Sequence, residues 1–193
     1  MREEPQPVKQ ATKPELPVRS RTKLLAETAV VIALSTVLSF VKFSIWPQGG
    51  SVTAGSMVPL FWFSLRRGAR WGITAGVVYG MVQFLVEPYF VHPAQLLLDY
   101  PIAFGALGLA GLFRTHKLIG VTVGIGGRFL AHFVSGVIFF AIYAPQVYLG
   151  LTIGANPYAY SALYNGSYLV AELVISLVLT FVLVKRNMID LYR

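Results

Sequence analysis

The run LLAETAVVIALSTVLSFVKF, from Leu24 to Phe43, decides the class of fold. Its only charged residues are Glu27 and Lys42, and each lies near one end of the run. At about 1.5 Å per residue, a helix of this length is roughly 30 Å long, which matches the hydrocarbon core of a bilayer. The sequence therefore predicts a membrane-spanning helix over 24–43.

The composition extends this interpretation to the whole chain. Of the 193 residues, 55% are hydrophobic and only 12% are charged, whereas an average soluble domain has about 25% charged residues. The chain has no cysteine, which excludes disulfides, thiolate metal sites and cysteine nucleophiles. We predict an all-α integral membrane protein. We expect no metal site and no enzyme activity, because the sequence shows no metal-ligand cluster and no catalytic motif.

Five further apolar segments complete a predicted bundle of six transmembrane helices with a long first external loop. They cover residues 52–67, 71–86, 93–113, 118–143 and 160–184. The segment WPQGGS at 46–51 ends the first helix, because proline lacks an amide donor and glycine admits unusual backbone angles. The second span is short, so it either starts inside the loop or sits partly behind other helices. Residues 1–20 are predicted to form a disordered cytoplasmic tail, and 21–193 the transmembrane domain.

The distribution of basic residues predicts the orientation. The net charge of +8 could suggest a nucleic-acid partner, but the Lys and Arg residues do not lie along one face, so we expect none. Fourteen of the sixteen basic residues lie in the N-terminal tail, beside Arg66 and Arg114, or at the C-terminus. Basic segments stay in the cytoplasm. The sequence thus predicts a multi-pass protein of the cell membrane with both termini cytoplasmic, which requires an even number of spans.

Ionisable residues at membrane depth are costly and are therefore candidates for function. Glu27 lies about one turn from the cytoplasmic end of its helix, where a structural role is expected. Glu172 lies deep in the last helix and could pair with a group of the fifth. Asp99 lies in the outer half of the fourth helix, and Arg128 and His132 share one face of the fifth.

Aromatic and polar side chains surround these groups in the predicted outer half of the bundle. A carboxylate, an imidazole, an amide and aromatic rings suit a small, flat, partly cationic ligand, because rings stack and a carboxylate offsets charge. Two structural alternatives remain open, an interfacial aromatic belt and an ion pair between Asp99 and Arg128 without a ligand. Helical spacing places Phe139 nearer the polar stripe than Phe140, and a wide pocket could use both.

Five separated motifs resemble the thiamine-specific substrate-binding component of energy-coupling-factor transporters. They are WPQGGS at 46–51, FSLRRG at 63–68, HPAQLLLDY at 92–100, HFVSG at 132–136 with Phe139 and Phe140, and YNGSY at 164–168. The resemblance implies six helices and a first external loop that closes over a vitamin site near the outer surface. It also assigns ligand contacts to Trp46, Tyr89, Asp99, Tyr100, Arg128, His132, Phe140, Tyr160 and Asn165.

The resemblance further implies partners. Thiamine is the expected ligand, and ATP is expected to act only on partner subunits, because this chain has no phosphate-binding loop and needs no cofactor of its own. A transmembrane coupling subunit and two ATPase subunits would supply the energy. Ala26, Ala29 and Ala33 offer a small-residue docking face on the first helix, with packing inside the bundle as the alternative.

Three other functions stay open from the sequence. The first is a self-sufficient thiamine transporter that couples uptake to protons through Asp99, His132 or Glu172. The second is the same architecture serving a different vitamin. The third is a membrane enzyme that uses His132 and Asp99 as an acid–base pair, for which no catalytic motif is present.

Overall fold

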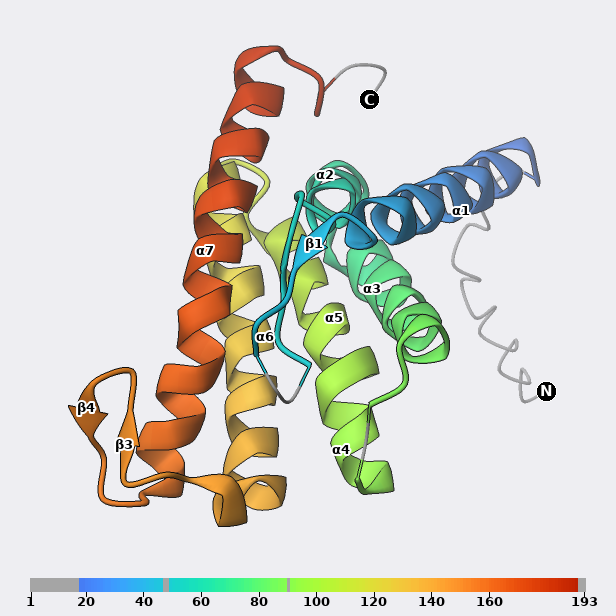
Figure 1. Cartoon of the computed structure of the whole chain (residues 1–193). Coiled ribbons are helices and arrows are strands. Elements are labelled where there is room, and N and C mark those ends of the chain that lie inside the picture. The colour runs from blue at the N-terminus through green and yellow to red at the C-terminus, as the bar shows by residue number, and fades with distance from the viewer. Residues whose placement is uncertain (1–17, 47–48, 90, 191–193) are drawn as a thin grey trace, which may run out of the picture.

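The computed structural model describes residues 18–46, 49–89 and 91–190 as a bundle of helices (Figure 1). Four of its helical segments are long and apolar enough to cross a membrane. They are Arg21–Ser39, Pro93–Leu112, Lys117–Phe139 and Pro157–Lys185. The chain is thus an α-helical membrane protein that crosses the bilayer several times, as predicted.

Helix α1 spans Val18–Ser39, so the first predicted helix is displaced toward the N-terminus. It begins inside the segment predicted to be a disordered tail, and residues 1–17 of that tail lie outside the described residues. The predicted C-terminal end at Phe43 is wrong. The strand β1, Lys42–Phe43, pairs antiparallel with β2, Val52–Thr53, so the chain turns back into the external loop before Phe43.

Helices α2, Val58–Arg67, and α3, Ala69–Val86, are separated only by Gly68, whose positive φ of 91° favours glycine. The second predicted helix was expected to start at residue 52, and this start is wrong. Val52–Thr53 forms β2, and α2 begins only at Val58. At ten residues, α2 is about 15 Å long and cannot cross the bilayer alone. Eight of its residues are buried, so it sits behind other helices, as the sequence suggested.

The fourth predicted helix is a continuous helical segment with three different geometries. It comprises α4 (Pro93–Leu97), the π-helix η1 (Leu98–Ile102), α5 (Ala103–Ala106) and the 3-10 helix η2 (Leu107–Leu112). Pro101 lies inside η1 and cannot donate a backbone hydrogen bond there. This segment packs closely on α3, because Gly72, Gly76 and Gly80 let the two backbones approach each other.

Helices α6, Lys117–Phe139, and α7, Pro157–Lys185, run side by side in Figure 1. The fifth predicted helix ends earlier than expected, and its last predicted turn is the 3-10 helix η3, Ala141–Tyr143. A short hairpin of β3, Val147–Tyr148, and β4, Leu151–Thr152, then leads to α7. The sixth predicted helix starts earlier than expected because Asn156 caps it. The side-chain oxygen of Asn156 accepts hydrogen bonds from the backbone amides of Tyr158 and Ala159.

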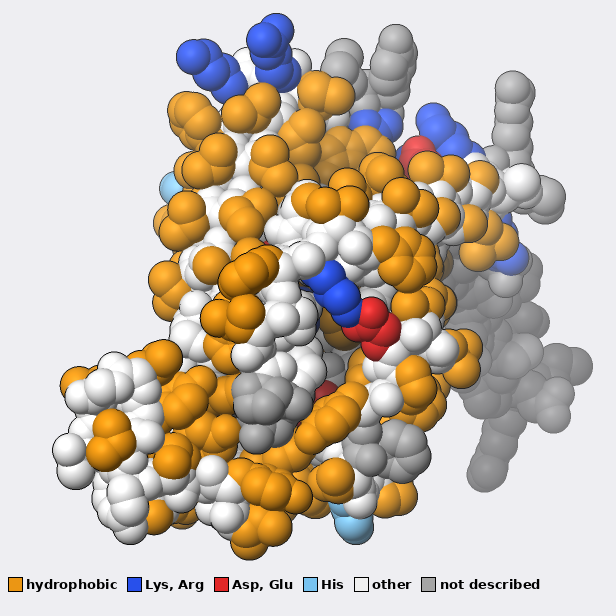
Figure 2. Space-filling view, viewed as in Figure 1, with side chains coloured by type: hydrophobic (Ala, Val, Ile, Leu, Met, Phe, Trp, Pro, Cys, Tyr) orange, Lys and Arg blue, Asp and Glu red, His pale blue; other side chains and the backbone are white. Residues whose placement is uncertain are grey.

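The surface in Figure 2 is largely hydrophobic, and basic side chains gather at the end of the bundle that carries the C-terminal end of α7. Glu27 belongs to this end, where Arg67 Nε donates to its carboxylate at 2.6 Å. Lys117 pairs with Asp190 there as well. Glu27 therefore joins α1 to α2, which agrees with the structural role predicted for it.

Candidate ligand-binding site

A cavity of about 250 Å³ opens in the half of the bundle opposite the basic end. It lies between α3, the α4–η2 segment, α6, α7 and the external loop at residues 49–51. Eight of the nine residues predicted to contact a ligand line it. They are Tyr89, Asp99, Tyr100, Arg128, His132, Phe140, Tyr160 and Asn165.

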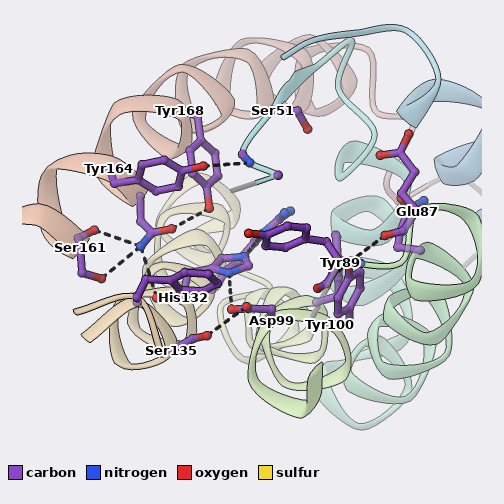
Figure 3. A pocket seen from close by; sticks show the side chains of 18 of the residues that line it. Ser51, Glu87, Tyr89, Asp99, Tyr100, His132, Ser135, Ser161, Tyr164 and Tyr168 are labelled. Atoms are coloured by element: carbon purple, nitrogen blue, oxygen red, sulfur yellow. Dashed lines mark hydrogen bonds and ion pairs between the residues drawn. The ribbon is translucent and has the colours of Figure 1, made fainter. Parts of the chain in front are cut away.

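Asp99 is the acidic centre of this cavity (Figure 3). It lies in the π-helix η1, a geometry that is frequent at functional sites. Its Oδ1 lies 2.9 Å from His132 Nδ1, while its Oδ2 accepts hydrogen bonds from Ser135 Oγ at 3.0 Å and Gln95 Nε2 at 2.8 Å. Gln95 is itself fixed, because its Oε1 accepts from Val91 N at 2.7 Å. The carboxylate is therefore oriented by side chains from two helices.

The ion pair between Asp99 and Arg128, which the sequence left open as an alternative, is not formed in the part of the chain that the structure describes. Arg128 Nε donates to His132 Nε2 at 3.2 Å, so Nε2 acts as an acceptor and Nδ1 carries the proton that faces Asp99. The guanidinium lies 4.1 Å from the centre of the Phe104 ring, and its Nη1 lies 3.0 Å from Met57 Sδ. Within the described residues Arg128 makes no ion pair. His132 occupies the position between the two charges, which leaves the charge of Asp99 available to a cationic ligand.

Aromatic rings form two walls of the cavity. Tyr160, Tyr164 and Tyr168 repeat every four residues along one face of α7 and are all buried. On the opposite side, the rings of Tyr89 and Phe140 stack with 6.2 Å between their centres. Partial burial raises the pKa of Tyr89, so its phenol remains a neutral hydrogen-bonding group at pH 7.

The two phenylalanines at the end of α6 lie differently with respect to the cavity. Phe140 is buried and lines the cavity. Phe139 instead stacks on His92 outside the cavity, with 5.2 Å between ring centres. The helix ends at Phe139, so ideal helical spacing no longer predicts the direction of the next side chain.

Two predicted contact residues organise the site through bonds inside the protein. Asn165 Oδ1 accepts from Tyr168 Oη at 2.9 Å, and its Nδ2 donates to the backbone of Ser161 and, at 3.3 Å, of His132. Asn165 thereby joins α6 to α7. Tyr100 Oη donates to the Glu87 carbonyl at 2.8 Å and accepts from Tyr89 N at 3.0 Å, which holds the segment after α3 against the cavity.

Trp46 is not among the residues that line the cavity, and it lies directly beside them, so its contact with a ligand stays a prediction. Its Nε1 donates to Ser167 Oγ at 2.7 Å, and its ring packs edge-on against Tyr168 with 5.7 Å between centres. Residues that follow Trp46 in the loop line the cavity. Gly49, Gly50 and Ser51 cover the cavity, and a Cβ on Gly50 would approach the ring of Tyr168 to 2.9 Å.

Several lining residues were not among the predicted contacts. They are Gly49, Gly50, Ser51, Gln83, Glu87, Pro88, Phe104, Ser135, Gly136, Ser161, Tyr164 and Tyr168. Ser135 could have been found from its position one turn from His132 on the polar stripe. Tyr164 and Tyr168 could have been found from their spacing of four with Tyr160. Glu87 and Phe104 carry no such signal, since their placement depends on how helices pack.

Comparison with known proteins gives one consistent result. The family model described as "Thiamine transporter protein" matches residues 25–190. The thiamine transporter ThiT of Bacillus subtilis is 36% identical over 170 residues, which cover 78% of this chain and 84% of the relative. ThiT of Lacticaseibacillus paracasei is 26% identical over 180 residues, covering 83% and 86% of the two chains.

A solved structure of ThiT from Listeria monocytogenes has the same fold. It superposes with a TM-score of 0.74 at 26% identity, and the match covers 86% of this chain and 96% of that one. The family model spans most of the chain, and the Bacillus relative exceeds 30% identity over most of its own length. The chain belongs to the thiamine transporter protein family.

Proposed function

We propose that this chain binds thiamine in the cavity around Asp99 and acts as the membrane substrate-capture subunit of an ATP-driven vitamin transporter. The observation that carries the proposal is the Asp99 carboxylate, which has no Lys or Arg partner among the described residues and is held by His132, Ser135 and Gln95 between two aromatic walls. Thiamine joins a cationic thiazolium to an aminopyrimidine. A carboxylate can offset the first ring or accept from the amino group of the second, and aromatic walls can stack on both.

The side chains of the cavity both face the ligand space and hold one another. Asp99, Tyr89, Phe140 and Tyr160 line the cavity. His132 and Asn165 also line it, and each makes hydrogen bonds that fix its neighbours. We therefore expect loss of either residue to weaken binding partly by displacing Asp99 or Tyr168.

We propose that separate subunits supply the energy, a transmembrane coupling subunit and two ATPases. Helix α1 offers a surface for the first of these. Ala26, Ala29 and Ala33 are exposed, as are Leu25 and other apolar side chains of α1. The exposure contradicts the alternative that this face packs inside the bundle. Figure 1 shows α1 projecting from the bundle away from α6 and α7, so a partner helix can approach it.

Replacing Ala29 or Ala33 by Trp is expected to leave thiamine binding unchanged and to abolish ATP-driven uptake. The bulky ring would prevent close approach of another helix, while the cavity lies on other helices. Ala33→Ser keeps the small size and should retain uptake. Binding titrations and uptake assays on the assembled complex would check this. Normal uptake by the Trp variants would contradict the proposed docking face.

We propose that both termini lie in the cytoplasm. Reporters fused after Arg186 or inserted beside Gly68 are expected to report a cytoplasmic location, because basic residues flank both positions. A reporter in the hairpin between β3 and β4, a segment without charged residues, should report an external one. An external signal at Gly68 or after Arg186 would overturn the orientation.

Uptake of labelled thiamine by cells that express the chain with and without the ATPase subunits tests the coupling. We expect uptake to require the ATPases and to survive an uncoupler while ATP is maintained. Uptake that persists without the ATPases and collapses with the uncoupler would instead favour the proton-coupled alternative.

A further inference from the structure

Glu172 is a buried carboxylate that the cavity does not use. It lies on α7, is only 2% exposed, and is absent from the cavity lining. It is also the only acidic residue in α7. A carboxylate at this depth is costly unless it has a partner. Among the described residues no hydrogen bond or ion pair joins Glu172 to the fifth predicted helix, and Arg128 of that helix interacts with it through charge alone, so the position calls for a further explanation.

The partner of Glu172 is the external loop. Its Oε1 accepts hydrogen bonds from the Thr53 backbone amide at 2.6 Å and from Thr53 Oγ1 at 2.8 Å. The hydroxyl groups of Thr53 and Ser56 also form a hydrogen bond, with 2.8 Å between their oxygens. Arg128 adds a favourable Coulomb interaction with the carboxylate. Within the described residues, Oε2 is buried and accepts no hydrogen bond. The whole hydrogen-bonding role of Glu172 is thus to hold Thr53.

Thr53 lies two residues after the segment that covers the cavity, Gly49–Ser51. Two weaker hydrogen bonds also join the loop to α7. Gly50 N of the covering segment donates to Tyr164 Oη at 3.3 Å, and Trp46, which lies before that segment, donates to Ser167. Both are bonds between neutral groups, whereas a carboxylate acceptor roughly doubles the strength of a hydrogen bond. An ion pair between Lys42 and Glu87 also holds this loop. The Glu87 side chain is more than half exposed, and exposed ion pairs contribute little to stability.

We infer that Glu172 is a positioning residue that holds the covering segment over the cavity by binding Thr53, and thereby sets how slowly the ligand leaves. The inference rests on the proposed function in one respect, that thiamine is the ligand. It assigns Glu172 neither a ligand contact nor a proton-transfer role. Two observations support the inference. Glu172 binds Thr53, and Thr53 lies two residues after Gly49–Ser51.

Dissociation kinetics of thiamine test the inference. In Glu172→Ala, which removes the acceptor, we expect the dissociation rate to rise roughly 10- to 100-fold, with little change in the association rate. Thr53→Val removes only the hydroxyl donor and should give a smaller rise. The double variant should be less than additive, because both changes remove the same interaction. Thr180→Val is the matched control, since Thr180 is equally buried on α7 but its hydroxyl has no hydrogen bond among the described residues.

A second measurement needs no ligand. The natural chain has no cysteine, so Ser51→Cys gives a single thiol in the covering segment. Its reaction with a soluble thiol reagent should accelerate when Glu172→Ala is added, and should not change with Thr180→Val. This result would stand even if the wild-type chain failed to bind thiamine, which would refute the proposed function alone.

Unchanged dissociation in both Thr53→Val and Glu172→Ala would overturn the inference. So would a slower association at a normal dissociation rate. If Glu172→Ala does not fold, Thr53→Val decides the matter, because valine matches threonine in shape and leaves the backbone amide bonded to the carboxylate.

Discussion

Asp99→Asn is expected to lower the affinity for thiamine by about 2 to 3 kcal/mol, a factor of roughly 30 to 150. The substitution keeps the size of the side chain and removes the charge that would offset the thiazolium. The geometry also predicts a modest effect on stability. Asp99 is bonded to His132, Ser135 and Gln95 rather than to Arg128, so the variant leaves no buried cation newly unpaired.

Matched variants separate a ligand site from a scaffold. His132→Ala and Asn165→Ala should also weaken thiamine binding, because they line the cavity and hold its walls. Glu27→Gln should leave affinity unchanged, since Glu27 pairs with Arg67 at the basic end of the bundle. Titrations with thiamine and thermal melts in detergent would be measured on each. Unchanged affinity in Asp99→Asn together with a large fall in melting temperature would show that Asp99 serves only the scaffold.

Gly76→Ala is expected to destabilise the protein by roughly 1 to 3 kcal/mol, and Gly76→Leu to prevent the bundle from forming. A Cβ on Gly76 would overlap the carbonyl of Phe104 and lie 3.0 Å from the Cα of Gly105. Both neighbours are backbone atoms of the α4–η2 segment, so no side-chain rotation can relieve the overlap. The close packing that places Asp99 and Tyr100 beside α3 depends on this contact.

Gly126→Ala is the control for that prediction. Gly126 lies in α6, and an added Cβ there meets nothing within 4 Å, so the change should be neutral or slightly stabilising. Melting temperature and the fraction of monodisperse protein in detergent would be compared for the variants. A wild-type melting temperature for Gly76→Ala would contradict the close approach of α3 to its neighbour.

Hydropathy predicted the helices well because the length of an apolar run reflects bilayer thickness. It could not predict the ends of the first two. The strands β1 and β2 have two residues each, too few to show a periodicity. Hydropathy could not predict the π-helix around Asp99 either. Pro101 signals an irregularity, but a proline alone does not specify a wider turn.

The sequence could place a site residue near the cavity where its helix and its depth were enough. Asp99 and His132 were placed in the outer half of the bundle by those two properties, and both line the cavity. The sequence could not tell which side chains pair with one another. Arg128 lies over the Phe104 ring and His132 stands between it and Asp99, an arrangement that depends on how α6 packs against the α4–η2 segment. The direction of the Trp46 indole could not be predicted either, since it is set by a hydrogen bond to Ser167 that hydropathy does not reveal.

Isothermal titration of the purified full-length chain with thiamine tests the central claim most directly. The account predicts one thiamine per chain with a dissociation constant on the order of 1 nM, or about −12 kcal/mol, within the limit for a ligand of this size. Riboflavin, which lacks a cationic ring, should give no binding under the same conditions. A folded chain that gives no heat with thiamine, or that binds riboflavin more tightly, would contradict the assignment of the Asp99 cavity to thiamine.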